Sequence, residues 1–169
     1  TGILKGPFTD SKTYNSYDTS EDEEGNVTKV QLSKTKSIPS IEAVSCWDFY
    51  PDPNATSIND CDYVIQRHSF NKQQLEDLAE KPMFNSDAVK ECLEMGPNYQ
   101  TRGFESSLYD RENITSIYKN RFEVLEYWGT IDRETADECG LNYSTDSEVI
   151  HVNVWICGNK VLRMVENPF

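Results

Sequence analysis

The residues best suited to nucleophilic or acid–base chemistry in this chain are two histidines and five cysteines. His68 and His151 each lie in a segment that alternates like a strand. The pairs Cys61–His68 and His151–Cys157 could act as nucleophile and base only if the fold brought them together, and no spacing selects either. The cysteines form no C-x2-C pair and are Cys46, Cys61, Cys92, Cys139 and Cys157. We therefore predict no catalytic residue and expect reduced, mostly buried thiols.

A group of acids and amides near residue 50 has oxygens that could bind calcium. The group comprises Asp48, Asp52, Asn54, Asp60 and Asp62. An EF-hand loop needs Gly at position 6 and Glu at position 12. A loop starting at Asp52 has Ser57 and Tyr63 there instead. The sequence predicts a rigid turn rather than a metal site.

Paired carboxylates could also do acid–base work in a glycosidase. Glu123 with Glu126, and Asp132 with Glu134, are such pairs, but in a chain with 29 Asp and Glu they carry no information. Phosphate loops, dinucleotide fingerprints and nucleophile elbows are absent from the sequence. We predict no cofactor-binding residue and no enzymatic activity.

The excess of acidic residues indicates which partners the chain can bind directly. Sixteen Lys and Arg face the 29 acids, for a net charge of −13. Duplex-binding surfaces neutralise phosphates with basic residues, so the chain is predicted to be a poor direct DNA binder. Lys34 and Lys36 are the nearest approach to a basic patch. No apolar run is long enough to span a membrane, no signal peptide is visible, and both ends suggest a fragment of a longer chain.

The N-terminal part predicts two short strands around a polar segment. Residues 3–8 and 27–32 are the expected strands, and 10–26 the solvated loop or hairpin tip between them. Ile38-Pro39 is expected to interrupt regular structure.

The middle part predicts a turn, a strand and two helices. Residues 45–56 form the turn and 61–70 the strand. Asn71 and Ser86 are the expected N-caps of the helices, which end at Pro82 and Gly96. Three tryptophans are predicted to lie in the core: Trp47, Trp128 and Trp155.

The C-terminal part predicts strands around one short helix. Residues 97–120 read as a polar connection, 122–129 as a strand and 132–138 as a helix. Gly158-Asn159 joins two further strands in a hairpin. The pattern predicts an α+β fold, a mixed and mainly antiparallel sheet with two or three short helices, in a single domain over residues 1–169. Its parts are 1–45, 46–96, 97–120 and 121–169.

Four segments follow one another along the chain in a recognisable order. They are residues 1–8 (TGILKGPF), 47–55 (WDFYPDPNA), 124–129 (VLEYWG) and 152–163 (VNVWICGNKVLR), with 167–169 after the last. Together they resemble the wing region of portal (head-to-tail connector) proteins of short-tailed bacteriophages. The first resembles its opening strand, the second its proline-aspartate turn, the third a family strand and the fourth the closing hairpin, with 167–169 as the exit from it.

The resemblance implies a structural role at the portal vertex, in the ring through which DNA is packaged and ejected and to which the tail attaches. Its expected partners are other portal subunits and the capsid protein, with DNA, terminase and tail proteins contacting the full-length ring and no membrane involved. The expected location is the virion, after assembly in the host bacterial cytoplasm. By itself the chain is expected to be monomeric or weakly associated.

Two alternatives stay open at this stage. The tyrosine-rich polar loop near the N-terminus fits a virion-surface or tail-associated recognition module without catalytic activity. Disulfides would favour that reading, and five free thiols the portal reading. A hydrolase using paired acids would need a pocket with two carboxylates of separated pKa.

Overall fold

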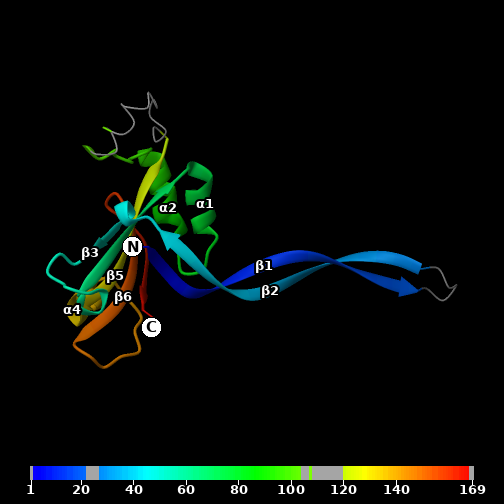
Figure 1. The fold of residues 1–169 in the computed structure, drawn as a ribbon, viewed down its shortest axis with the longest axis horizontal. Coiled ribbons are helices and arrows are strands. Elements are labelled where there is room, and N and C mark those ends of the chain that lie inside the picture. The colour runs from blue at the N-terminus through cyan, green and yellow to red at the C-terminus, as the bar shows by residue number, and fades with distance from the viewer. Residues whose placement is uncertain (1, 22–26, 104–106, 108–119, 168–169) are drawn as a thin grey trace. The chain divides into compact units, whose positions relative to one another are not determined.

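The computed structural model describes residues 2–21, 27–103, 107 and 120–167 (Figure 1). The chain divides into two compact units, Thr1–Cys46 and Trp47–Phe169. We call them the ribbon and the α+β unit. The expectation of one domain over 1–169, with a first part ending at residue 45, stays a prediction, and each unit is described by itself below.

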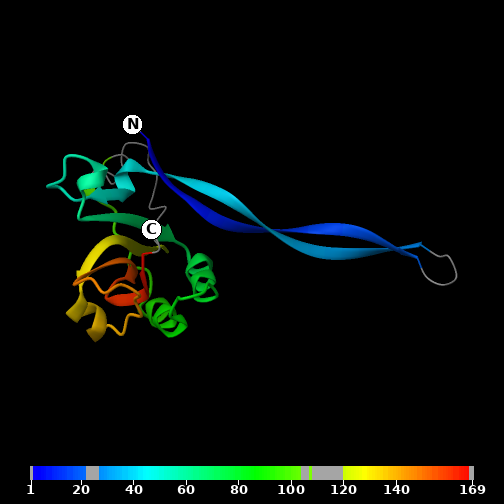
Figure 2. The same cartoon turned by 90° about the horizontal axis from the view of Figure 1, so that it is seen from below.

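The ribbon consists of two long antiparallel strands, β1 (Ile3–Glu21) and β2 (Val27–Val44). Their pairing is continuous from Phe8 to Glu21, with one irregularity between Lys5 and Phe8. The twisted ribbon is shown from two directions in Figures 1 and 2. Its two strands form a sheet of their own.

The prediction of two short strands around a long polar loop was wrong for most of this unit. Residues 10–21 continue β1, and β2 runs through Ile38-Pro39 to Val44. Proline is tolerated there because each strand of a two-stranded ribbon has a free edge that needs no N–H donor. The many Ser and Thr residues read as loop, but Thr is also a good strand former. Residues 22–26, the rest of the predicted tip, lie outside the described residues.

The α+β unit is built on a five-stranded antiparallel sheet. The spatial order follows the chain order: β3 (Phe49–Pro51), β4 (Tyr63–Phe70), β5 (Phe122–Asp132), β6 (Val149–Cys157) and β7 (Lys160–Glu166). Gly158, with φ of 59°, and Asn159 make the predicted turn between the last two strands. The α+β fold class is confirmed.

Helices α1 (Lys72–Ala79) and α2 (Ser86–Met95) interrupt the strand order between β4 and β5. Asn71 is the N-cap of α1, as the sequence predicts, and it forms a capping box with Gln74. For α2 the N-cap is Asn85 rather than Ser86, because the Asn85 side chain accepts from the backbone amides of Asp87 and Ala88. Gly96, with φ of 84°, ends α2 as expected.

One core cluster lies between α1, α2 and the sheet. Its buried residues are Leu75, Leu78, Ala88, Val89, Cys92, Phe122, Val124, Cys157 and Leu162. The backbone amide of Asn85 also donates to the carbonyl of Leu162, at 2.7 Å, which joins the helix pair to β7. Trp155 packs against this cluster, while Trp47 is 59% exposed, so the prediction of a core Trp47 was wrong.

A second cluster involves α4 (Arg133–Glu138), the short helix predicted at 132–138. Asp132 caps it by accepting from the backbone amide of Thr135, and Gly140 follows with φ of 67°. Ala136 packs there with residues of β6 and their neighbours, namely Ile150, Val152 and Val154. Most of the predicted 97–120 connection, residues 104–106 and 108–119, lies outside the described residues.

Candidate functional site: a two-faced ribbon and two buried polar clusters

The ribbon carries different chemistry on its two faces. In an antiparallel pair, alternate residues of each strand and their cross-strand partners share a face. From Phe8 onward the register pairs Lys12 with Lys36 and Tyr14 with Lys34. One face therefore groups a set that we call the lysine face: Phe8, Asp10, Lys12, Tyr14, Ser16, Leu32, Lys34, Lys36, Ile38 and Ser40.

The opposite face is uncharged over the same length. It groups Thr9, Ser11, Thr13, Asn15, Tyr17, Gln31, Ser33, Thr35, Ser37 and Pro39, and we call it the hydroxyl face. Thr13 and Thr35 share a hydrogen bond of 3.2 Å across the strands. Sequence reasoning identified Lys34 and Lys36 as the nearest basic patch but missed Lys12, since only the register brings it beside them.

The lysine face exposes apolar as well as basic side chains. All three lysines are exposed. Tyr14 is 50% exposed, and Phe8 and Leu32 are 38% exposed each. Exposed apolar side chains grouped with charges on one side of a strand pair are typical of an interaction surface.

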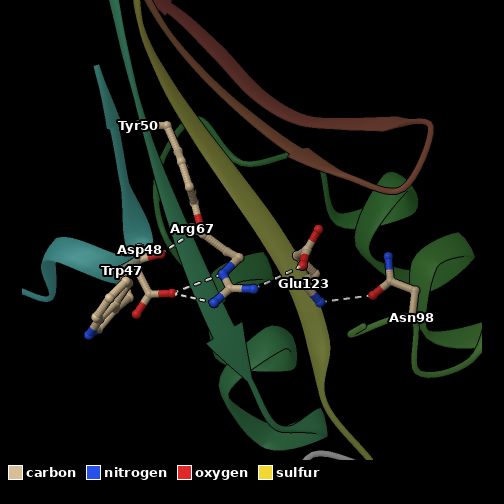
Figure 3. Close-up of polar contacts among 6 residues, drawn as sticks. All are labelled: Trp47, Asp48, Tyr50, Arg67, Asn98 and Glu123. Carbon is tan, nitrogen blue, oxygen red and sulfur yellow. Dashed lines mark hydrogen bonds and ion pairs between the residues drawn. The ribbon is translucent and has the colours of Figure 1, made fainter. Parts of the chain in front are cut away.

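The first buried polar cluster surrounds Arg67 of β4 (Figure 3). Its side chain is 1% exposed, and its Nη2 and Nε lie 2.7 and 2.8 Å from Oδ1 of Asp48. A second carboxylate, Glu123 of β5, lies 3.8 Å from Nη1, and the ring of Tyr99 lies under the guanidinium. A guanidinium stays protonated and only donates, so this arrangement is an anchor rather than an acid–base site.

What Arg67 anchors is the Trp-Asp-Phe-Tyr segment. Asp48 lies in the 3₁₀ turn Cys46–Asp48 that leads into β3, and the Tyr50 hydroxyl donates to the Trp47 carbonyl at 2.6 Å. Asn98 accepts from the Glu123 backbone amide at 2.8 Å. Figure 3 shows these contacts converging from both sides of β4 and β5. The predicted rigid turn is thus fixed to the sheet by a buried cation.

The second polar cluster centres on Glu126 of β5, which is 2% exposed. Its carboxylate lies 2.8 Å from Nε2 of His68 and accepts from Nδ2 of Asn153 at 3.2 Å. Trp155 donates its indole N–H to Asn153 at 2.9 Å. A buried carboxylate needs such partners, because burial without them is costly.

His68 packs against two aromatic rings. The ring of Phe70 stacks on it at 5.4 Å and that of Trp155 at 4.9 Å. Arg163 of β7 lies over the Phe84 ring; burial lowers the pKa of this guanidinium and the charge of Glu126 opposes the shift. The cluster ties four strands together and is placed to stabilise the sheet.

The residue pairs considered for catalysis contact other groups instead. His68 contacts Glu126, whereas the Cys61 thiol lies 3.5 Å from the Ser57 carbonyl. Cys157 is buried against Cys92, while His151 is exposed. The carboxylates of Glu123 and Glu126 contact different partners, Arg67 and His68.

All five cysteines are free, but only Cys92 and Cys157 are buried, so the expectation of mostly buried thiols was wrong. Cys46 and Cys139 are exposed. Burial raises the pKa of the Cys157 thiol to about 12, and the neighbouring Cys92 adds to the shift. A thiol held protonated is a poor nucleophile.

The acids considered for calcium serve the turn instead. Asp52 is buried and accepts from the backbone amide of Asn54 at 2.8 Å. Asp60 accepts from the Thr56 hydroxyl at 3.3 Å, and Asp48 contacts Arg67. Among the described residues no three His, Cys, Asp or Glu side chains are grouped so that they could hold a metal ion.

A pocket of about 510 Å³ lies beside the helices, lined in part by Lys72, Glu94 and Phe122. Neither polar cluster lines it. It holds one cation and one carboxylate from α1 and α2 and no paired acids, so it is a poor match to the hydrolase alternative.

Among the described residues of the α+β unit, exposed charge is densest in residues 132–148, which we call the acidic segment. All six of its acids are exposed: Asp132, Glu134, Asp137, Glu138, Asp146 and Glu148. Its single base, Arg133, turns inward, where it donates to the Thr145 carbonyl at 3.0 Å and lies over the Tyr143 ring. The segment therefore presents negative charge without a compensating cation of its own.

Comparison with family models and with curated protein sequences finds no match to this chain. Within the described residues, no helix has the length and apolar character needed to cross a membrane. Function must therefore be argued from the ribbon, the polar clusters and the acidic segment themselves.

Proposed function

We propose that the chain is a structural, non-catalytic component of a multi-subunit assembly. The observation that carries this proposal is the ribbon: 19 residues of β1 and 18 of β2 in a sheet of only two strands. A lone two-stranded hairpin is marginally stable in water. Its many exposed strand residues gain stability only when another surface covers them.

The α+β unit supports the same role through the type of its polar contacts. Its buried charges are engaged with each other and with turns: Arg67 with Asp48, and Glu126 with His68. Such contacts fix shape, and they use up the groups that would otherwise be available for chemistry.

The specific assembly that we propose is the portal vertex of a tailed bacteriophage. Three of the segments that resemble the portal wing belong to the α+β unit and support this proposal. The Trp47–Ala55 turn contains the Asp48 anchor, Val124–Gly129 belongs to the central strand β5, and Val152–Arg163 forms the β6–β7 hairpin. A ring subunit needs surfaces that fit a second copy rather than an active site.

Electron microscopy of the complete gene product that contains this chain tests the proposal. The expected particles are closed rings with a central channel. Particles that stay monomeric at all protein concentrations, or a specific hydrolytic activity that copurifies with the chain, would contradict it.

One observation favours the second candidate, a virion-surface or tail-associated recognition module. Tyr17 and Trp47 are 68% and 59% exposed, and aromatic side chains of this kind are common in recognition surfaces. Binding of the purified chain to host cells, in the absence of ring formation by the gene product, would favour this candidate over the first.

A further inference from the structure

The ribbon has one face whose charge differs from the rest of the molecule. Residues 1–46 contain five lysines and seven acids, and the remaining residues contain 11 basic and 22 acidic side chains. Between Asp10 and Asp18 and their cross-strand partners, the ribbon has three lysines and no acid. All three lysines, 12, 34 and 36, are on the lysine face, where the register places Asp10 before them and Asp18 after them.

From this difference we infer that the lysine face docks on the acidic segment of a second copy of this chain. The inference rests on the proposed function, because it assigns the surface through which subunits meet. The occupant is identified by charge: the α+β unit has a net charge of −11, most concentrated in residues 132–148. Opposite charges on two surfaces steer and orient association.

Exposed apolar side chains on both surfaces add to the charge complementarity between them. Tyr14 and Leu32 are exposed between the lysines, and Val149, which directly follows the acidic segment, is 48% exposed. An interface commonly places such side chains at its centre and the charges around them. The hydroxyl face, which has neither lysine nor carboxylate over this length, is left toward solvent or a further partner.

Nucleic acid is the competing occupant of a lysine-bearing strand pair with exposed tyrosines. The rest of the molecule disfavours it, since a duplex approaching the ribbon also meets the field of a strongly acidic chain. Three lysines on one face neutralise few phosphates.

Zero-length carbodiimide coupling tests the contact directly, since it joins an amine to a carboxylate only where the two are in contact. We would mix unlabelled and ¹⁵N-labelled full chains at up to about 1 mM, which detects dissociation constants in the millimolar range. The expected products link Lys12, Lys34 or Lys36 to acids of residues 132–148 in peptides that combine both isotopes.

Two triple variants of equal net charge provide the matched comparison in sedimentation equilibrium. Lys12→Gln/Lys34→Gln/Lys36→Gln removes the charge of the lysine face. Asn15→Glu/Gln31→Glu/Ser37→Glu lowers the net charge by the same amount on the hydroxyl face. We expect the first variant to self-associate about tenfold more weakly than the second, and added salt to weaken the wild type toward the first.

Several results would overturn the inference. Cross-links confined to one isotope would mean that each ribbon contacts its own chain. Equal association of the two variants, or the absence of any cross-link, would also contradict the inference. So would binding of a labelled DNA duplex by the wild type that the lysine-face variant loses. Rings of the gene product that form through other cross-links would defeat this inference and leave the proposed function standing. Cross-links at the expected positions without rings would support the contact between copies and contradict the proposed function.

Discussion

The ribbon and the α+β unit are both built on antiparallel β-strands, but the α+β unit buries side chains in a core and the ribbon exposes most of its described side chains. In the α+β unit, each of the strands β4 to β6 has a neighbour on both edges, and helices or loops supply two core clusters. In the ribbon each strand has one neighbour, and most of its described side chains are exposed. Strand pairing by itself therefore does not make a core; a second layer does.

The same difference predicts that the α+β unit is stable by itself and that the ribbon depends on a partner for its stability. Burial of apolar area supplies most of the favourable free energy of folding, at about 25 cal/mol per Å². The α+β unit gains this energy within itself. The ribbon is left with backbone hydrogen bonds and cross-strand contacts, so it is the part whose order depends most on a partner.

Hydrogen exchange should show the largest contrast between the two units. In the dilute chain we expect amides of β1 and β2 to exchange at least about a hundredfold faster than those of β5 and β6, because local opening of the ribbon exposes no core. Mass spectrometry of quenched, digested samples measures this. Equal protection in both units would contradict the proposed dependence of the ribbon.

A matched pair of leucine truncations sharpens the contrast. Leu162 is fully buried, whereas Leu32 of the ribbon is 38% exposed. We expect Leu162→Ala to lower the free energy of unfolding by about 2–5 kcal/mol and Leu32→Ala by less than about 0.5 kcal/mol. Urea denaturation followed by Trp fluorescence checks both. A large loss from Leu32→Ala in the monomer would mean that the ribbon has a core of its own.

The Arg67 anchor should matter for the α+β unit alone. Asp48→Ala removes the carboxylate at 2.7 Å and leaves a buried guanidinium with the more distant Glu123. We expect a loss of about 1–3 kcal/mol in unfolding free energy, and a smaller loss for Glu123→Ala. Ribbon exchange rates should be unchanged in both variants. The opposite ranking would mean that Glu123 is the main partner.

The last predicted effect is a pH dependence of stability from the buried Cys157 thiol, and it is confined to alkaline solution. The folded state raises the pKa of Cys157 from 9.0 to about 12, so folding favours the protonated thiol. Its stabilising contribution is complete below pH 9 and declines as the pH rises toward 12, by up to about 1.4 kcal/mol per pH unit.

Comparing wild type with Cys157→Ala isolates that contribution from the titrating tyrosines. The stability of the variant should fall less steeply above pH 9. Iodoacetamide at pH 8 should label the exposed Cys46 and Cys139 and spare Cys157 in the folded chain. Rapid labelling of Cys157 would contradict its buried, protonated state.

The sequence predicted the α+β unit better than the ribbon for a physical reason. Caps and turns are local signals: Asn71 with Gln74, Gly96, and Gly158-Asn159 specify their structures within a few residues. The ribbon has no apolar alternation long enough to signal a strand, because neither face is buried. Its register, and with it the lysine face, depends on contacts between residues up to about forty positions apart.

The two polar clusters were beyond sequence reasoning for a related reason. Arg67 and Asp48 are 19 residues apart, and His68 and Glu126 are 58 apart. Only the sheet register brings them together. The acidic segment was visible as sequence, but in a chain with 29 acids nothing distinguished it until Arg133 was found to turn inward.

Sedimentation velocity of the full chain and of a shortened form tests the central claim, that the ribbon is the element through which copies associate. The shortened form replaces residues 9–39 with Asn-Gly, so that Phe8 and Ser40, which are register partners, flank a two-residue turn. We predict that the full chain shows weak self-association that grows with concentration at low salt, while the shortened form sediments as a folded monomer throughout. Equal association of both forms would contradict the account.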